Sequence, residues 1–205
     1  MKKFGYMLLA LCMLTGMIAG CGATDSDETI LIVGKNGKVQ SIDVEAFDKS
    51  YYTEEDFKSF AEDAITTYNK THEVDAVTLT SFTVEEDTAK LKMKFKSVED
   101  YSSFTDIPLY QGTVAQAYAA GYKFDTSFSR VEKGEIVGTA AKSEILESEK
   151  LHVVIIAANT DVKVAGKIIY VSTDNVTVTA KDTISIRDEE NPSLESDKYT
   201  YIIYK

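Results

Sequence analysis

The sequence TAKLKMKFK, residues 88–96, decides the fold class of this chain. Its apolar residues alternate with lysines at a period of two. That period is typical of a β-strand with one face in a core and the other in solvent, because successive side chains of a strand point to opposite faces. Antiparallel sheets commonly have one solvated face, so residues 88–96 predict a strand of an antiparallel sheet.

The lysines of this strand form a row on its polar face: Lys90, Lys92, Lys94 and Lys96. Such a row is unusual in an acidic protein. One hypothesis is a cationic strip that binds an anionic ligand or partner. The alternative, which the sequence favours, is a solvated face whose lysines pair with Asp or Glu and discourage edge-to-edge aggregation.

Two hairpins are expected in the first half of the chain. Residues 76–84 and 88–96 flank Glu85-Glu86-Asp87 and form one of them. Residues 29–33 and 38–44 flank Gly34-Lys35-Asn36-Gly37 and form the other. The Asn-Gly pair favours the positive φ angles of a type I′ turn, so that turn type is predicted there.

An amphipathic helix is predicted between the hairpins, over about residues 54–70. Thr53 can cap its N-terminus, and Asp56 occupies the reciprocal position of a capping box. One apolar face recurs at helical spacing through Phe57, Phe60, Ala61, Ala64, Ile65 and Tyr68. We expect this face to cover the sheet.

Shorter elements follow in both halves of the chain. Helices are predicted over residues 98–104, 114–120 and 141–146, with strands over 127–132 and 135–138. From residue 151 onward the β signal is dense, with strands predicted over 151–157, 162–164, 167–171, 176–179, 183–186 and 199–204. The acidic stretch 187–198, which contains Pro192, is predicted to be a solvent loop.

The expected fold class is therefore α+β: antiparallel β-hairpins with a covering amphipathic helix, then a β-rich C-terminal part. Residues 29–205 are expected to form one domain. A subdivision near residue 140, into an α+β part and a β-rich part, stays open because no low-complexity linker marks it.

The N-terminal segment predicts the subcellular localisation of the protein. Residues 1–20 have a basic start, an apolar stretch and small residues at the end, the three parts of a secretory signal peptide. The run Ile18-Ala19-Gly20-Cys21 resembles the lipobox of bacterial lipoproteins. This resemblance implies cleavage before Cys21 and attachment of acyl chains such as palmitate to its thiol. An ordinary cleaved signal, or an uncleaved anchor over residues 4–23, is the alternative.

A lipoprotein of this kind resides on the outer face of the cytoplasmic membrane, in the cell envelope. Residues 21–28 would form a short acidic tether, whose last seven residues reach about 25 Å when extended. Cleavage removes two lysines and no acids from 22 basic and 33 acidic residues, which leaves a net charge of −13. Such a body repels polyanions, so nucleic acid is not an expected partner.

The chain also resembles uncharacterised lipoproteins of clostridial-type Firmicutes. The resemblance rests on residues 44–52 (VEAFDKSYY), 161–172 (DVKVAGKIIYVS) and 201–205 (YIIYK). These segments correspond to hairpins and strand ends, so the resemblance supports the predicted localisation and implies no functional residues.

Common catalytic signatures are absent from the sequence. There is no Gly-x-Ser-x-Gly elbow and no phosphate-binding Gly-x-x-x-x-Gly-Lys loop. The two histidines, His72 and His152, have no ligand at metal-binding spacing, and Cys12 leaves with the signal peptide. We therefore expect no cofactor, no metal site and no catalytic residue.

Three functional hypotheses remain. The first is a lipid-anchored, non-catalytic module that binds an envelope protein or a wall component. The second is a ligand-capturing lipoprotein that serves a transporter or sensor, for which a closed cavity lined by tyrosines would be evidence. The third is a carboxylate-dependent wall hydrolase, which needs two acids facing each other in a cleft.

Overall fold

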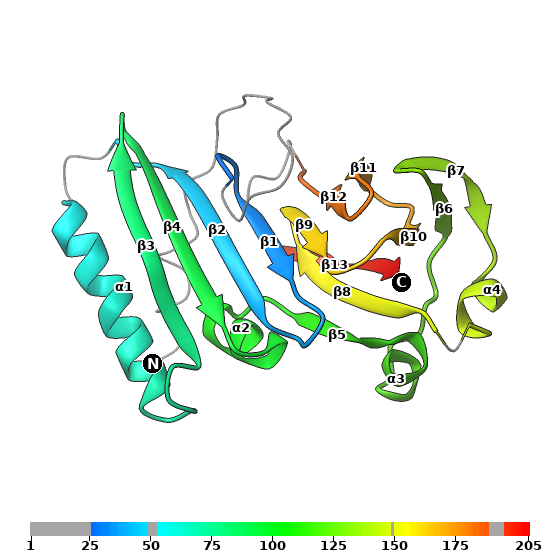
Figure 1. Ribbon diagram of the computed structural model, residues 1–205, viewed down its shortest axis with the longest axis horizontal. Helices are drawn as coiled ribbons and strands as arrows, with labels where there is room; N and C mark the ends of the chain where they lie inside the picture. Colours follow the sequence, from blue (N-terminus) through cyan, green and yellow to red (C-terminus); the bar gives the residue numbers. More distant parts are fainter. Residues whose placement is uncertain (1–25, 49–52, 149, 189–194) are drawn as a thin grey trace.

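The computed structural model of this protein describes residues 26–48, 53–148, 150–188 and 195–205 (Figure 1). These residues form four helices and 13 strands, with 21% of the described residues in helix and 45% in strand. The strands lie in two sheets that are mainly antiparallel. The predicted α+β, β-rich fold class is therefore confirmed.

The larger sheet, sheet A, has seven strands in the order β11-β12-β9-β1-β2-β4-β3. Its strands are β1 (Ile30–Val33), β2 (Val39–Ala46), β3 (Val77–Glu85), β4 (Thr88–Phe95), β9 (Asp161–Val164), β11 (Thr177–Ala180) and β12 (Thr183–Ser185). The pair β1–β9 is parallel, and it joins the start of the described chain to its C-terminal part. The lysine strand β4 lies between β2 and β3, so it is not the edge strand that the aggregation argument assumed.

The smaller sheet, sheet B, has six strands in the order β5-β8-β13-β10-β6-β7. Its strands are β5 (Leu109–Thr113), β6 (Phe128–Glu132), β7 (Glu135–Ala140), β8 (His152–Ala158), β10 (Ile168–Ser172) and β13 (Glu195–Tyr204). The β-rich C-terminal part of the chain is thus divided between both sheets.

The four helices are α1 (Glu54–Asn69), α2 (Val98–Thr105), α3 (Val114–Ala119) and α4 (Lys142–Leu146). The predicted capping box of α1 is present, because the Asp56 backbone N–H donates to Thr53 Oγ1 over 3.1 Å and Asp56 accepts from the Thr53 backbone. The predicted apolar face of α1 packs on β3, with the rings of Phe57 and Phe82 stacked at 5.1 Å.

Two hydrophobic cores lie on the two faces of sheet B. In β8, Val154 and Ile156 belong to the first core, which also contains residues of sheet A and α2. Their neighbours Val153 and Ile155 belong to the second core, which contains residues of α3 and α4. All four are fully buried. The period of two explains why β8 is an almost continuous apolar run: both of its faces are covered.

The two hairpin turns differ from the turn types that the sequence suggests: two consecutive positive φ angles occur in the β3–β4 turn and not in the β1–β2 turn. In the β1–β2 connection only Gly37 has a positive φ, of 74°, and Gly34 N donates to Lys38 O over 2.8 Å. The predicted type I′ turn at Asn36-Gly37 is therefore wrong, because that turn requires positive φ at both central residues. In the β3–β4 connection, by contrast, Glu86 and Asp87 have φ of 48° and 64°.

Two further boundaries differ from the prediction. Strand β5 was not predicted at all, because it is short and contains Gly112. The expected solvent loop 187–198 ends early, because β13 begins at Glu195 and pairs there with Ala158 of β8. A shift in register between Glu195 and Thr200 marks an irregularity in this part of the strand.

Candidate functional site

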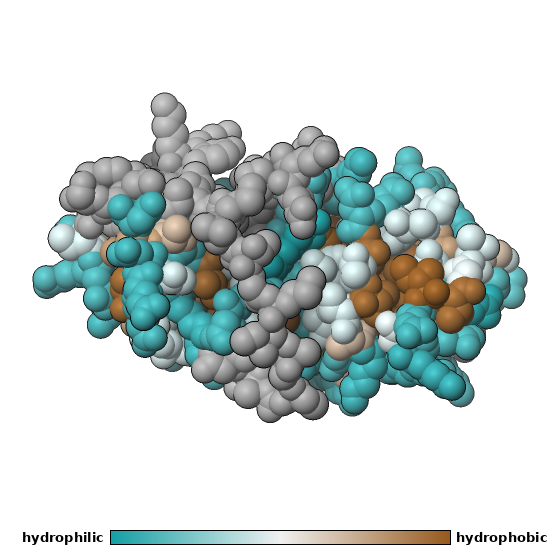
Figure 2. All heavy atoms as spheres, turned by 90° about the horizontal axis from the view of Figure 1, so that it is seen from above, coloured by the Kyte–Doolittle hydropathy of each residue, from teal (hydrophilic) through white to brown (hydrophobic). Residues whose placement is uncertain are grey.

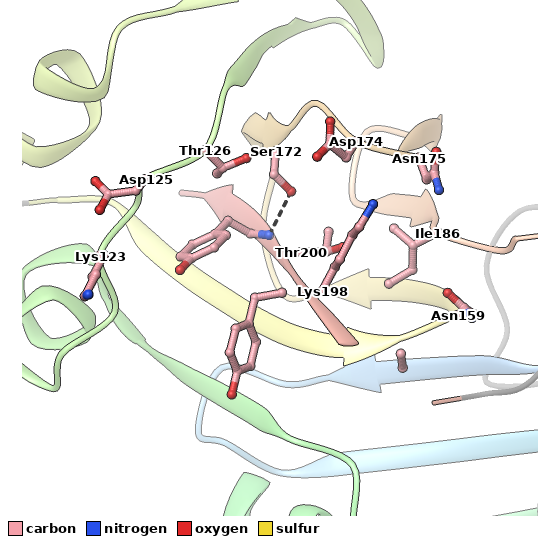
Figure 3. Close-up of a pocket in the computed structure, with 13 residues that line it drawn as sticks. Lys123, Asp125, Thr126, Asn159, Ser172, Asp174, Asn175, Ile186, Lys198 and Thr200 are labelled. Atoms are coloured by element: carbon pink, nitrogen blue, oxygen red, sulfur yellow. Dashed lines mark hydrogen bonds between the residues drawn. The ribbon is translucent and has the colours of Figure 1, made fainter. Parts of the chain in front are cut away.

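The candidate site is a polar pocket of about 410 Å³ beside the end of β10 (Figure 3). Its lining comes from five separate parts of the chain: Lys123, Asp125 and Thr126; Ala158 and Asn159; Ser172, Asp174 and Asn175; Ile186; and Lys198, Tyr199, Thr200 and Tyr201. None of these residues was predicted as a site residue.

A buried hydrogen bond fixes the base of the pocket. Ser172 is the last residue of β10 and is 3% exposed. Its Oγ accepts a hydrogen bond from the backbone N–H of Tyr201 over 3.0 Å, and Figure 3 shows this bond as a dashed line. The side chain therefore holds β13 against β10 at this point.

The first wall is the segment that leads from α3 into β6. Lys142 of α4 donates to Asp125 Oδ1 over 2.5 Å and to the backbone oxygen of Lys123 over 2.6 Å. The hydrogen bond and charge of Lys142 lower the pKa of Asp125. Asp125 is therefore ionised at neutral pH, and it can accept hydrogen bonds but not donate a proton.

The opposite wall is the turn that follows β10. Thr173 N donates to Ser127 O over 3.0 Å, which joins this turn to the start of β6. Asn175 has a φ of 53°, in the left-handed region that Asn tolerates better than most residues. The turn thereby presents Asp174 and Asn175 at the pocket, where both are exposed.

An aromatic row runs from the pocket along sheet B. Tyr199 lines the pocket and is 46% exposed, and its ring meets the ring of Tyr122 edge to face at 5.8 Å. Tyr122 in turn lies 4.9 Å from Tyr110. Burial raises the pKa values of Tyr110 and Tyr122. One ring therefore faces the solvent at the pocket, and two partly buried rings support it.

The lining combines groups of both charges with neutral polar groups. Two carboxylates, two ammonium groups, two amides and three hydroxyl-bearing Ser and Thr residues contribute to it, besides the tyrosines. Since the formal charges balance, the pocket does not select strongly for an ion of one sign. Convergent donors and acceptors beside an exposed ring suit a neutral, hydroxyl-rich ligand.

The lysine row lies apart from this pocket, on sheet A. The register of β2, β4 and β3 places Lys90, Lys92 and Lys94 opposite the core face that carries Leu91 and Met93, and Lys96 follows the end of β4. Lys90 Nζ lies 3.0 Å from Asp27 Oδ1, and Lys96 Nζ lies 3.8 Å from Glu73 Oε2 and contacts Val74 O. Lys94 is exposed and Lys92 partly buried.

The two histidines do not line the pocket. The ring of His72 stacks on Tyr68 of α1 at 3.7 Å, and the ring of His152 lies 5.7 Å from Tyr204. In the described parts of the chain, no group of three or more His, Cys, Asp or Glu side chains is arranged to hold a metal ion.

An exposed edge lies at the far end of sheet B. Ile136 and Val137 of β7 are 48% and 53% exposed, and hydrophobic side chains gather at this end of the molecule in Figure 2. The register with β6 shifts at Val137, between the pairs Val131–Ile136 and Arg130–Gly138. Such a bulge interrupts the row of backbone groups that another strand would need for pairing.

The lipobox residues Ile18, Ala19, Gly20 and Cys21 lie outside the described residues. The last residues of the predicted tether are described, and they contact the domain: Asp27 pairs with Lys90, and Glu28 pairs with Arg187 at 3.0 Å. Within the residues that the structure describes, no helix is long and apolar enough to cross a membrane.

Comparisons with protein-family models, with curated proteins and with solved structures find no match to this chain.

Proposed function

We propose that this protein is a lipoprotein of the bacterial cell envelope, anchored through Cys21, whose folded domain binds a saccharide of the wall without catalysing a reaction. The anchor is supported by the lipobox-like run at residues 18–21. The ligand class is supported by one observation above all: the charge-balanced polar pocket adjoins the exposed ring of Tyr199. A sugar presents hydroxyl groups at its rim and C–H groups on its face, which match polar groups and a tyrosine ring respectively.

Binding is favoured over hydrolysis by the state of the acids. A glycosidase needs one carboxyl group that keeps its proton near neutral pH and a second that is ionised. In the pocket, Lys142 lowers the pKa of Asp125, which is the wrong direction for a proton donor. Burial raises the pKa values of Asp43 in β2 and of Asp161 in β9, and neither residue lines the pocket.

The shape of the pocket favours a wall polymer over a small captured molecule. Sites that capture small molecules usually enclose most of the ligand surface. Here the lining includes exposed residues of a turn, Asp174 and Asn175, together with the exposed Tyr199. Such a site can hold one or two units of a chain whose remainder stays in solvent.

The anchor is tested by Cys21→Ser in the full chain. We expect the variant to move from the membrane fraction to the soluble fraction, because one or more acyl chains supply the membrane affinity. The control is Cys12→Ser, which changes a cysteine inside the predicted signal and should leave the protein in the membrane fraction. A Cys21→Ser protein that still fractionates with lipid would contradict the proposal.

The pocket is tested by Tyr199→Ala, with calorimetric titration of the detergent-solubilised protein against soluble peptidoglycan fragments. We expect the affinity to fall about tenfold, which corresponds to about 1.4 kcal/mol. The matched control is Tyr118→Ala, because Tyr118 is 56% exposed on α3 and does not line the pocket. Equal affinities of all three proteins, or no binding by the unmodified protein, would reject the saccharide site.

A further inference from the structure

The face of sheet A that carries the lysine row is richer in basic groups than the rest of an acidic protein. The strand registers place Lys90, Lys92 and Lys94 of β4 and Lys163 of β9 on this face. The same registers place Glu85 and Asp161 there, and three further acids, Asp27, Glu28 and Asp182, pair with Lys90, Arg187 and Lys163 respectively. With Arg187 included, the basic and acidic groups of this face are equal in number, whereas the whole chain has 33 acidic and 22 basic residues, so this face is less acidic than the protein as a whole.

The described chain begins on this same face. Asp27 Oδ1 lies 3.0 Å from Lys90 Nζ, and the next residue, Glu28, contacts Arg187. Thr29 then fixes the start of β1, because its Oγ1 donates to Val44 O over 3.1 Å and accepts from Val44 N over 2.9 Å. The tether therefore leaves the folded domain beside the lysine row.

The distance from this exit to the proposed anchor is short. Ser26, the first described residue, is five residue steps from Cys21, and these steps span at most about 18 Å when extended. The exit cannot lie farther than this from the acylated cysteine. The surface around the exit is thus the part of the domain held closest to the membrane.

From these observations we propose that the lysine row lies against the membrane and contacts anionic phospholipid headgroups. This inference rests on the proposed anchor at Cys21. The partner is chosen by charge complementarity at the end of a short tether: the lysines are cations, and anionic lipids give the bilayer surface a negative potential. Anchor and lysine row would together fix how the domain is oriented.

The net negative charge of the domain does not oppose this contact at short range. Electrostatic interactions in water are screened over about 8 Å at physiological ionic strength. Lysines that lie within this distance of the headgroups are attracted, whereas acids on α1, which packs on the opposite face of sheet A, are screened from the surface. The lysine row therefore decides which side of the anchored domain approaches the membrane.

The experiment measures energy transfer from two positions on the domain to an acceptor on lipid headgroups. One donor is attached at Thr78→Cys, an exposed position opposite Lys94 in the β3–β4 ladder. The other is attached at Glu62→Cys, an exposed position on α1. The full acylated protein is reconstituted into vesicles of phosphatidylcholine, with or without phosphatidylglycerol.

We expect more transfer from Thr78 than from Glu62 in the phosphatidylglycerol vesicles. The excess should be lost in the variant Lys92→Glu/Lys94→Glu and when the salt concentration is raised from about 0.1 M to 1 M, which shortens the screening length from about 10 Å to 3 Å. The matched control Lys58→Glu/Lys70→Glu makes the same change in net charge at exposed residues of α1 and its C-cap, and it should keep the excess.

Several results would overturn the inference. Equal transfer from both positions in a protein that floats with the vesicles would reject the orientation while leaving the anchor intact. An equal excess with and without phosphatidylglycerol would reject anionic headgroups as the partner. A protein that does not float with vesicles at all would reject the anchor, and the orientation with it. If the charge-reversed pair loses its native circular dichroism, Lys92→Gln/Lys94→Gln replaces it in the same comparison.

Discussion

Asp43 is an acid on the apolar face of a strand. The register of β2 with β4 places it opposite Leu91, a core residue. The Ser41 hydroxyl donates to Asp43 Oδ2 over 2.9 Å, which favours the ionised form, but burial outweighs this bond and raises the pKa of Asp43 to about 6. Burial, followed by the charge of Asp43, also raises the pKa of Tyr101 on α2.

Asp43→Asn is expected to stabilise the protein at pH 7.5 and to change little at pH 4. The pKa of Asp43 is higher in the folded state, about 6, than its ordinary value of 3.8, so the folded state binds more protons between these values. Its stabilising effect is therefore present below pH 4 and is lost as the pH rises through 6. At pH 7.5, Asp43→Asn should raise the free energy of unfolding by at most about 3 kcal/mol.

Urea unfolding at the two pH values measures this effect. Asn keeps an oxygen that can accept from Ser41, so the hydrogen bond is not the variable. The control is Asp63→Asn on the exposed side of α1, which should give similar free energies of unfolding to the parent protein at both pH values. If the Asp43→Asn protein is no more stable than the parent protein at pH 7.5, the raised pKa of Asp43 is contradicted.

The sequence could not identify the pocket at the scale of single residues. Residues 172–175 form a turn sequence after the predicted strand 167–171, and the structure places Ser172 at the end of β10 and Asp174 and Asn175 in the turn. Tyr199 was predicted to begin a strand, but it lies within β13, which begins at Glu195. Their convergence with Asp125 depends on contacts between distant parts of the chain. No spacing motif encodes such contacts, whereas the lysine row was visible because a single strand carries it.

At the scale of elements, the β3–β4 turn offers a direct test of local strain. Glu86 and Asp87 both have positive φ, a conformation that costs an ordinary L-residue about 1–2 kcal/mol. Replacing them by Asn-Gly, the pair that this geometry prefers, should raise the free energy of unfolding by about 1–2 kcal/mol. For a chain of this length, the melting temperature should rise by about 2–4 °C per kcal/mol.

The β1–β2 turn supplies a control in which the substitution should lower the melting temperature. Gly37 has a φ of 74°, so Gly37→Ala should lower the melting temperature, although Ala is the better residue in most ordinary backbone conformations. Thermal unfolding followed by circular dichroism measures both variants. If Asn-Gly at residues 86–87 lowers the melting temperature, the left-handed conformation of this turn is not the source of strain.

Most elements were predictable because their signals are local. The capping box of α1 and the alternation in β4 lie within a few residues, and both are found where they were expected. The Asn36-Gly37 turn was predicted wrongly because the dipeptide preference was overridden by a longer connection closed by Gly34 and Lys38. Strand β5 was missed because its pairing with β8, not its own short sequence, makes it a strand.

At the scale of the whole molecule, we expect residues 26–205 to unfold in one step. The first core contains residues from both sheets, and the parallel pair β1–β9 links the beginning of the described chain to the region beyond residue 140. Neither part of the chain can open without exposing this core. Differential scanning calorimetry should therefore give a calorimetric enthalpy equal to the van 't Hoff enthalpy. Two separate transitions would instead support a subdivision near residue 140.

The arrangement of the two sheets was the part of the fold least accessible to prediction. The six C-terminal strands were expected, but the sequence does not indicate that β9, β11 and β12 join sheet A while β8, β10 and β13 join sheet B. Strand pairing is decided by which apolar faces can be buried together, and the short apolar strands of this region are similar in that respect. The fold class followed from local patterns, and the topology did not.

The position of β1 also determines how the protein would respond to mechanical force. Strand β1 is the first strand after the tether, and it is hydrogen-bonded to β2 on one side and to β9 on the other. Asp161, close to Asn159 of the pocket, pairs with Ile30, and Arg187, next to Ile186 of the pocket, contacts Thr29 O. A pull between the membrane and a wall-bound pocket would therefore act on these few contacts at the start of β1, and most of the two sheets would not carry it.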